Sequence, residues 1–259
     1  MSELGEKRSD LLDGGTSCPI CGYSSDKRQQ DERCPGCGEA ARTRSLAPFI
    51  ERGLSGYMGT PPLADGRLLA FAITTAELRM LRPLFAEIVS VSLFGQYGEG
   101  GRHQQGVDIR DLSRFPAASF AAVFGILIFD YLTEIRQAMD QVFRVLQPGG
   151  LLFTMISPDR LTDGLSPPTV VKTIEAQPDY FSYLPSGTKL VSISVGRRWF
   201  NRELRRAGFR AQHLVIPDGL TNMTSDWFVG RKPTEAETGI AARLASGWKA
   251  LTGAMRAKA

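Results

Sequence analysis

The sequence predicts an α/β protein: a Rossmann-like, doubly wound, mostly parallel sheet with an antiparallel edge hairpin, plus a small N-terminal zinc ribbon. Three observations predict it. Apolar runs of strand length alternate with amphipathic stretches over residues 67–156, as in a parallel sheet covered on both faces. Two later apolar runs, 210–216 and 226–231, favour a hairpin at the sheet edge. Four cysteines form two C-x2-C pairs near the N-terminus, a spacing typical of a tetrahedral metal site.

The elements of the main domain follow in order. Parallel strands are expected at four apolar runs: 67–73, 88–93, 122–129 and 150–156. Helices are expected at 75–85, 133–146 and 199–207. In the second helix apolar residues recur at helical spacing, and Pro148-Gly149-Gly150 ends it and turns the chain into the next strand. This apolar stripe is expected to face the core.

The composition divides the chain into domains. Residues 1–16 are polar and predict a disordered lead, and 17–58 predict the ribbon with a linking helix at 45–58. Pro61-Pro62 marks the start of the main domain, 59–233. Within it, residues 157–188 are rich in Pro, Asp, Ser and Tyr without periodicity, which predicts a lid or substrate loop.

The last residues, 234–259, predict an amphipathic helix. The stretch Thr234-Glu-Ala-Glu237 is a capping box, and one apolar stripe follows it: Ile240, Leu244, Trp248, Leu251 and Met255. Packing of this stripe on the main domain is favoured over a partner or membrane surface.

Length and charge set limits on the class of protein. The chain has 259 residues, of which 42% are hydrophobic, and a net charge of +4. This size allows one enzyme-sized core, and no apolar run has membrane-spanning length. The charged N-terminus is unlike a secretory signal, so a cytoplasmic location is expected. The mild net charge does not indicate nucleic-acid binding. Arg42 and Arg44 are expected on a solvated helix face.

The two cysteine pairs are matched knuckles, Cys18-Pro-Ile-Cys21-Gly and Cys34-Pro-Gly-Cys37-Gly. Four thiolates close a tetrahedral shell round one metal ion and leave no open position for water or substrate, so the site is expected to be structural. Zinc is the favoured metal, and iron is the alternative because both suit tetrahedral sulfur sites. Ordinary buried thiols or two disulfides are the less favoured interpretations.

The order of motifs resembles a known family. The motifs are the ribbon, Val107-Asp108-Ile-Arg-Asp-Leu, Phe115-Pro-Ala-Ala-Ser-Phe120, Val145-Leu-Gln-Pro-Gly-Gly150 and Arg-Ala-Gly208-Phe209. Together they resemble class I S-adenosylmethionine-dependent methyltransferases of the small-molecule type, in the branch with an N-terminal cysteine ribbon. The resemblance extends from Cys18 to Pro233. It implies S-adenosylmethionine as cofactor, zinc as structural metal, and a methyltransferase-like domain at 59–233.

The resemblance also implies which residues bind the cofactor: Ala72, Ile73, Thr74, Glu77, Ser92, Leu93, Asp108, Ile109, Gly125 and Ile126. The loop after the first strand holds the methionine part in the family, but it lacks glycine and acid between Phe71 and Thr74 here. Ser92 stands where a carboxylate usually takes the ribose hydroxyls. Asp108 keeps the acid that receives the adenine amino group, with Ile109 against the adenine face. The loss of two charge-assisted hydrogen bonds predicts weakened cofactor binding.

Glu77 has two interpretations. Thr74-Thr-Ala-Glu77 predicts a capping box, which satisfies the helix amides internally. Alternatively, Glu77 replaces the absent acid and pairs with the cofactor's ammonium group. The capping box is favoured.

A sulfonium is already an activated methyl donor, so a general base is needed only where the acceptor carries a proton. Candidate bases are His103, in the glycine-rich loop 95–106, and Asp130 and Tyr131, which match the family's Glu-His pair. His213 lies in a late strand and is expected to be structural. A solvated His103 and a helix-capping Asp130 are the competing interpretations.

Three functions follow. The first is methyl transfer from S-adenosylmethionine to a small-molecule or conjugated acceptor. The second is a catalytically inactive binding or assembly module, whose ribbon or C-terminal helix contacts a protein partner. The third is a nucleic-acid methyltransferase in which the ribbon, Arg42 and Arg44 grip phosphates. The retained Asp108 favours the first function, and the missing anchors favour the second.

Overall fold

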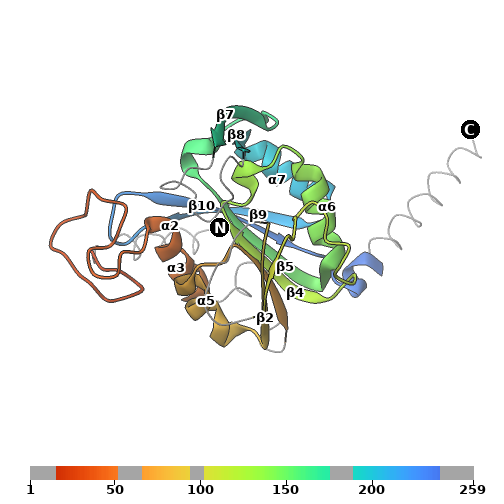
Figure 1. Cartoon of the computed structure of the whole chain (residues 1–259), viewed down its shortest axis with the longest axis horizontal. Coiled ribbons are helices and arrows are strands. Elements are labelled where there is room, and N and C mark those ends of the chain that lie inside the picture. Colours follow the sequence, from red (N-terminus) through yellow and green to blue (C-terminus); the bar gives the residue numbers. More distant parts are fainter. Residues whose placement is uncertain (1–15, 52–65, 94–101, 176–188, 240–259) are drawn as a thin grey trace, which may run out of the picture.

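The computed structural model describes residues 16–51, 66–93, 102–175 and 189–239. Its centre is a seven-stranded sheet of order β3-β2-β1-β4-β5-β10-β9 (Figure 1). The strands are β1 (Arg67–Phe71), β2 (Glu87–Ser92), β3 (Arg102–Gln105), β4 (Phe120–Ile126), β5 (Leu146–Ile156), β9 (Arg210–Pro217) and β10 (Thr224–Arg231). Strands β1 to β5 pair in parallel, and β10 runs antiparallel to both β5 and β9. The predicted doubly wound sheet with its antiparallel hairpin is confirmed.

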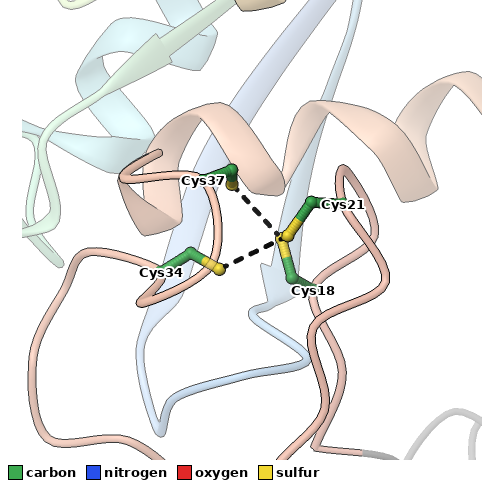
Figure 2. Close-up of side chains that lie close together, drawn as sticks. All are labelled: Cys18, Cys21, Cys34 and Cys37. Atoms are coloured by element: carbon green, nitrogen blue, oxygen red, sulfur yellow. Dashed lines mark hydrogen bonds between the residues drawn. The ribbon is translucent and has the colours of Figure 1, made fainter.

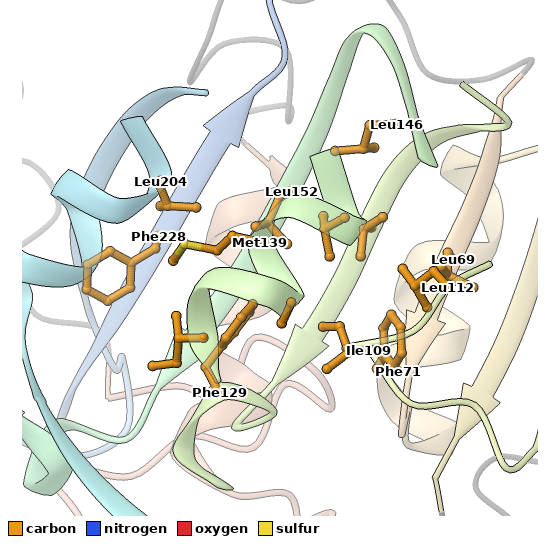
Figure 3. Close-up of a cluster of buried hydrophobic side chains, with 14 of the residues drawn as sticks. Leu69, Phe71, Ile109, Leu112, Phe129, Met139, Leu146, Leu152, Leu204 and Phe228 are labelled. Carbon is orange, nitrogen blue, oxygen red and sulfur yellow. The ribbon is translucent and has the colours of Figure 1, made fainter. Parts of the chain in front are cut away.

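Helices cover both faces of the sheet (Figure 1). They are α2 (Ala41–Arg44), α3 (Leu46–Glu51), α5 (Thr75–Leu81), α6 (Ile135–Val145) and α7 (Arg197–Arg206), with the short 3-10 turns η1 (Arg82–Leu84), η2 (Phe129–Tyr131) and η3 (Pro158–Arg160). Alternate residues of β1 face opposite ways, as strand geometry requires. Leu69 and Phe71 join the cluster under α6 and α7 (Figure 3), whereas Leu68 and Ala70 join the cluster under α3 and α5.

The predicted lid is more regular than its sequence suggests. Between β5 and α7 the chain forms η3, β6 (Leu161–Thr162), β7 (Thr169–Glu175) and β8 (Lys189–Gly196), and these strands make a second sheet of order β6-β8-β7. Only Ile174 of β7 is buried, so the strand carries no alternating pattern for sequence reasoning to find. Residues 176–188 lie outside the described part of the chain.

The predicted glycine-rich loop 95–106 is partly wrong, because its residues Arg102–Gln105 form strand β3. This strand is polar and lies at the sheet edge, so it gives no apolar run. After it, residues 106–119 contain no helix. Ile109, Leu112 and Phe115 from this stretch fill the cluster on the α6 side instead.

The ends of the domains agree with the sequence only in part. The linking helix, predicted at 45–58, starts earlier as α2 and α3, and residues 52–58 lie outside the described ranges together with Pro61-Pro62. The capping box is confirmed: the Thr234 amide donates to Glu237 at 2.8 Å and the Glu237 amide donates to Thr234 Oγ1 at 3.3 Å. The predicted lead, 1–15, and the apolar stripe, 240–259, fall outside the described residues. Among the helices described, none is both long and apolar enough to cross a membrane.

Candidate functional site

The four cysteines meet at one point (Figure 2). All four Sγ atoms lie within 4.8 Å of one another. The distance from Cys18 to Cys37 is 3.8 Å, and from Cys21 to Cys34 it is 3.7 Å. A tetrahedral zinc site with zinc–sulfur bonds of about 2.3 Å has sulfur–sulfur edges of about 3.8 Å. The cluster therefore has the size and donor set that fit zinc.

The glycine after each pair explains how the knuckles close. Gly22 has φ of 74° and Gly38 has φ of 75°, in the left-handed region that favours glycine. Each turn is held by an amide: Gly22 N donates to Cys18 O at 2.9 Å, and Gly38 N donates to Cys34 O at 2.7 Å. The repeated Cys-Pro-x-Cys-Gly sequence thus sets the geometry locally.

The pKa values of Cys34 and Cys37 depend on burial and on the neighbouring thiols. Burial and the neighbouring thiols raise the pKa of Cys37 to about 12. Burial acts the same way on Cys34, but backbone amides and the other thiols outweigh it and lower its pKa to about 7. A bound cation would draw all four into the thiolate form, because the thiolate is the metal ligand.

The ribbon is anchored in the main domain by a buried ion pair. Arg44 donates to both carboxylate oxygens of Asp218, at 2.9 and 2.8 Å, and both side chains are almost completely buried. Asp218 also accepts bonds from the Thr221 amide and hydroxyl, at 2.8 and 2.6 Å. The expectation that Arg44 lies on a solvated helix face is therefore wrong. Arg42 does lie nearer the surface, paired with Glu32 at 3.0 Å.

Apolar contacts complete this junction. Phe49 of α3 stacks on Trp227 and Phe153 of the sheet, with ring centroids 5.2 and 5.6 Å apart. The Trp227 indole donates to Ser45 Oγ at 3.0 Å, and Leu220 packs with Cys18 and Cys34. The ribbon and the sheet therefore share one core.

A cavity of about 450 Å³ lies between the ribbon and helices α3 and α5. Its lining includes Ile20, Cys37, Ile50, Ala76 and Met80.

The first of those strand ends is the turn from β1 into α5. Ala72 has φ of 47°, and its amide donates to Val91 O at 2.8 Å. Ile73 is fully buried. Thr74 and Glu77 form the predicted capping box, with the Thr74 amide 2.9 Å from Glu77 Oε2 and the Glu77 amide 3.3 Å from Thr74 Oγ1. The favoured interpretation of this motif is confirmed.

Glu77 is buried as well as bonded. Its other oxygen accepts from Thr43 of the ribbon helix at 3.5 Å. Burial raises the pKa of this carboxyl. Both oxygens thus face donors from the protein.

The second strand end shows what occupies the ribose position. Ser92 is buried, and its hydroxyl lies 3.1 Å from His103 Nε2. Ser90 Oγ lies 3.0 Å from the other ring nitrogen of His103. His103 is thus half-buried in strand β3 and bonded to two serines of β2, which differs from the loop position predicted for it. Leu93, the next residue of the predicted set, is exposed.

Asp108 lies where the adenine amino group is expected, but an arginine already holds it. Arg110 donates to Asp108 through Nε at 3.0 Å and Nη2 at 2.6 Å, and through its amide at 2.8 Å. Arg110 also reaches Glu134 at 3.1 Å. Burial works against it, but these bonds lower the pKa of Asp108. Ile109 is buried beside Phe71 (Figure 3).

The fourth strand brings apolar side chains to the same edge. A Cβ on Gly125 would lie 2.6 Å from Ile128 Cγ1 and 3.4 Å from Phe71 Cβ, so the Ile128 side chain occupies the space that glycine leaves. Ile126 ends the strand, and Leu127 follows with φ of 59°. The centre of the expected crevice is therefore lined by bulky groups.

Asp130 differs from the other predicted residues in that part of it has no partner. Its Oδ1 accepts from the Ser157 amide at 3.0 Å, and its buried Oδ2 has no hydrogen-bond partner among the described residues. Burial raises the pKa of this carboxyl to about 7. Tyr131 lies next to it in η2, half-buried. His213 pairs instead with Asp226, 2.7 Å away in the hairpin, as its expected structural role requires.

Sequence reasoning missed the residues that occupy the predicted site. Arg110 is two residues from Asp108, so the Asp-x-Arg spacing was a local signal for this pair. Ser90 and Asp218 had no such signal, because their partners come from other strands or from the ribbon.

Comparisons with known proteins give a match to one family model over part of the chain, and a fold. Residues 84–154 match the family model described as a methyltransferase domain. No curated protein matches the chain. Solved structures match at low identity, which shows the fold alone.

The [4+2]-cyclase SpnF has 15% identity and a TM-score of 0.50, covering 90% of this chain and 94% of its own. An S-adenosylmethionine-dependent methyltransferase from Mesorhizobium loti has 12% identity and a TM-score of 0.49, covering 73% and 98%. The YcgJ protein from Bacillus subtilis has 14% identity and a TM-score of 0.49, also covering 73% and 98%.

Proposed function

We propose that this chain, which carries a methyltransferase domain in the fold of S-adenosylmethionine-dependent methyltransferases, transfers a methyl group to a small-molecule or conjugated acceptor. The observation that carries the proposal is the match of residues 84–154. This segment spans β2 to β5 and includes Asp108 and the ends of the strands that line the expected crevice.

The residues fit the cofactor in part. In a sheet of this kind ligands bind beyond the carboxyl ends of the strands, at the point where the strand order reverses, which is between β1 and β4. Asp108 would receive the adenine amino group after Arg110 shifts away, and Ser92 would replace the usual carboxylate at the ribose. Ala72, Ile73, Thr74, Leu93, Ile109, Gly125 and Ile126 would form the rest of the wall. The cofactor supplies an activated methyl group on a sulfonium, so alignment is the main demand on the protein.

Asp130 is the group best suited to take a proton from the acceptor. It lies in η2, four residues after the end of β4. Its Oδ2 has no hydrogen-bond partner in the described part of the chain, and its pKa of about 7 suits a general base at neutral pH. His103 is bonded at both ring nitrogens, and Tyr131 lies beside Asp130. We assign the proton transfer to Asp130, with Tyr131 beside it in the same 3-10 turn.

The remaining regions receive structural roles in this proposal. The four cysteines hold zinc, since the sulfur spacing fits its tetrahedron, and the site has no open position for catalysis.

The β6–β8 insert follows β5 at the same edge of the sheet and closes over the acceptor as a lid. The protein acts in the cytoplasm.

A second function, a catalytically inactive binding module, is favoured by three contacts. Arg110 forms an ion pair with Asp108, His103 is hydrogen-bonded to the Ser92 hydroxyl, and the Ile128 side chain lies over Gly125. A fold of this type also serves other chemistry, since SpnF is named a cyclase. The third function, nucleic-acid methylation through the ribbon, loses its main support because Arg44 is buried on Asp218.

Calorimetric titration of the metal-loaded protein with S-adenosylhomocysteine separates the first two functions. We expect micromolar affinity, weakened on the order of tenfold to a hundredfold by Asp108→Ala. The matched control is Asp111→Ala, an exposed acid three residues away, which is expected to leave the affinity unchanged. No heat up to millimolar ligand would support the inactive module instead.

A further inference from the structure

The cavity between the ribbon and helices α3 and α5 has the size and composition of a ligand site. Cavities that bind small molecules have volumes of about 300 to 1,000 Å³ and a mostly apolar wall with a few polar groups. This cavity measures about 450 Å³. Three parts of the chain form its described wall: Pro19, Ile20, Cys37 and Glu39 of the ribbon, Ala47, Ile50 and Glu51 of α3, and Ala76, Arg79 and Met80 of α5.

The two helices form their parts of the wall in the same way. They pack against each other (Figure 1), and in each helix the wall residues lie three and four positions apart, on one side. Each side combines two apolar residues with one charged residue. Phe49 and Leu78 are buried in the core under these helices, whereas Ile50 and Met80 are only partly buried and extend that core outward to the cavity.

The charged groups of the wall are not used by the fold. Within the described part of the chain, the side chains of Glu39, Glu51 and Arg79 make no hydrogen bond or ion pair. By contrast, Glu32 of the same ribbon is paired with Arg42 at 3.0 Å. Two acids against one base leave the wall with an excess of one negative charge.

The metal site adds to this negative charge. Cys37 lines the cavity and is one of the four cysteines whose sulfurs have the spacing of a zinc site. Four thiolates around a divalent cation carry a formal charge of about −2. A cationic ligand with an apolar body is therefore complementary to this wall.

We propose that the cavity between the ribbon, α3 and α5 binds a small amphipathic amine. Its ammonium group lies toward Glu39 and Glu51, and its apolar body packs against Ile20, Ile50 and Met80. Unlike charges orient the ligand, and burial of apolar surface supplies most of the affinity. The wall converges from three elements on one hollow, whereas peptides bind along a strand edge or a long helix groove. Binding here is independent of whether the protein transfers methyl groups.

Methyl NMR of the full-length, metal-loaded protein tests this proposal with three matched probes. Phenethylamine, phenethyl alcohol and hydrocinnamate share one aromatic ring and differ in charge. We expect phenethylamine to shift the methyl signals of Ile50 and Met80 with a dissociation constant on the order of a millimolar. The alcohol should bind more weakly than the amine, and the carboxylate should bind most weakly. The variants Ile50→Val and Met80→Leu assign the two signals.

Changes of charge in the wall should act in opposite directions. Glu39→Gln/Glu51→Gln should weaken amine binding about tenfold, because it removes both acids. Arg79→Gln should tighten it about twofold to threefold, because it removes a like charge. The matched control Asp26→Asn/Glu235→Gln removes two exposed acids outside the wall and should bind like the parent protein. Circular dichroism should show the variants folded, and Arg79→Gln alone keeps the test valid, since damage to the fold does not tighten binding.

Four results would overturn the proposal. The first is hydrocinnamate binding as tightly as phenethylamine, and the second is an equal loss of affinity in the acid variant and its control. The third is weaker amine binding in Arg79→Gln. The fourth is no shift of the Ile50 and Met80 signals at the highest soluble concentration of the amine. Much tighter binding of a peptide of alternating leucine and lysine, lost in the acid variant, would assign the cavity to a protein partner instead.

Discussion

The four-cysteine ribbon and the residues proposed to bind the cofactor use their polar groups in opposite ways. In the ribbon, the four sulfurs turn toward one point and meet mainly one another. Among the residues proposed to bind the cofactor, Glu77, Ser92 and Asp108 are each bonded to other side chains of the protein. A site that is preorganised for its ligand keeps its donors and acceptors directed at that ligand. The comparison indicates that the four thiols are arranged to bind a metal ion, whereas cofactor binding at the proposed site would require internal hydrogen bonds to be exchanged.

Removal of the metal should have the largest effect. The ribbon contributes Arg44, Ser45 and Phe49 to the core under α3 and α5, so unfolding of the ribbon exposes part of the main domain. We expect chelation, or Cys34→Ser, to lower the thermal midpoint by roughly 10 to 20 °C. The control Asp26→Asn, an exposed site in the same ribbon, should leave it unchanged. Calorimetry showing an undisturbed main transition after metal loss would contradict the shared core.

Loss of the buried ion pair between Arg44 and Asp218 should have the second largest effect on stability. Arg44→Met leaves Asp218 charged and buried without its partner, which costs about 3 to 5 kcal/mol in the free energy of unfolding. The exposed pair offers a matched control, since Arg42→Met removes a similar contact to Glu32 that contributes about 0 to 1 kcal/mol. Urea denaturation of both variants measures the difference. Equal losses would show that the ribbon is not anchored through this ion pair.

The raised pKa of Asp130 predicts that the free energy of unfolding depends on pH. Its pKa is about 7 in the folded protein and 3.8 in the reference state, so the contribution to stability is full below about pH 4 and is lost as the pH rises through 7. Between pH 5 and pH 8 the parent protein should lose roughly 3 kcal/mol relative to Asp130→Asn. Denaturation curves of the two proteins at both pH values give this difference. A difference that stays constant with pH would mean that the carboxyl is ionised throughout.

Substitution of Arg110 should have the smallest effect, a change in ligand affinity. It is also the most direct test of the internal bond to Asp108. If Arg110 competes with the adenine amino group for Asp108, Arg110→Gln should tighten S-adenosylhomocysteine binding by about tenfold. Titration calorimetry measures the change, with Arg114→Gln as an exposed control four residues away. Weaker binding in Arg110→Gln would assign the arginine a direct role in holding the ligand.

The parts of the fold that the sequence predicts correctly are those with strong local patterns. Strands β1, β4 and β5 are nearly continuous apolar runs, because both faces of the sheet are covered. Strands β3 and β7 escape prediction because polar or exposed residues dominate them. A strand at the edge of a sheet needs no continuous apolar run, so its sequence gives little sign of a strand.

The same reasoning separates the two sites. The metal cluster depends on two short knuckles, and each knuckle is determined by its own five residues. Arg44 resembles any basic residue at a helix end, because its partner Asp218 lies far away in the chain. The bonds that occupy Ser92 likewise come from a neighbouring strand that the sequence did not reveal. Long-range pairing therefore limits how far sequence alone predicts a site.

Hydrogen exchange with S-adenosylhomocysteine tests the central claim most directly, because it reports where the ligand binds. We expect added ligand to slow exchange at the carboxyl ends of β1, β2 and β4 and over residues 107–112, with the ribbon unaffected. Unchanged exchange at these strand ends with saturating ligand present would contradict a cofactor site at this edge of the sheet.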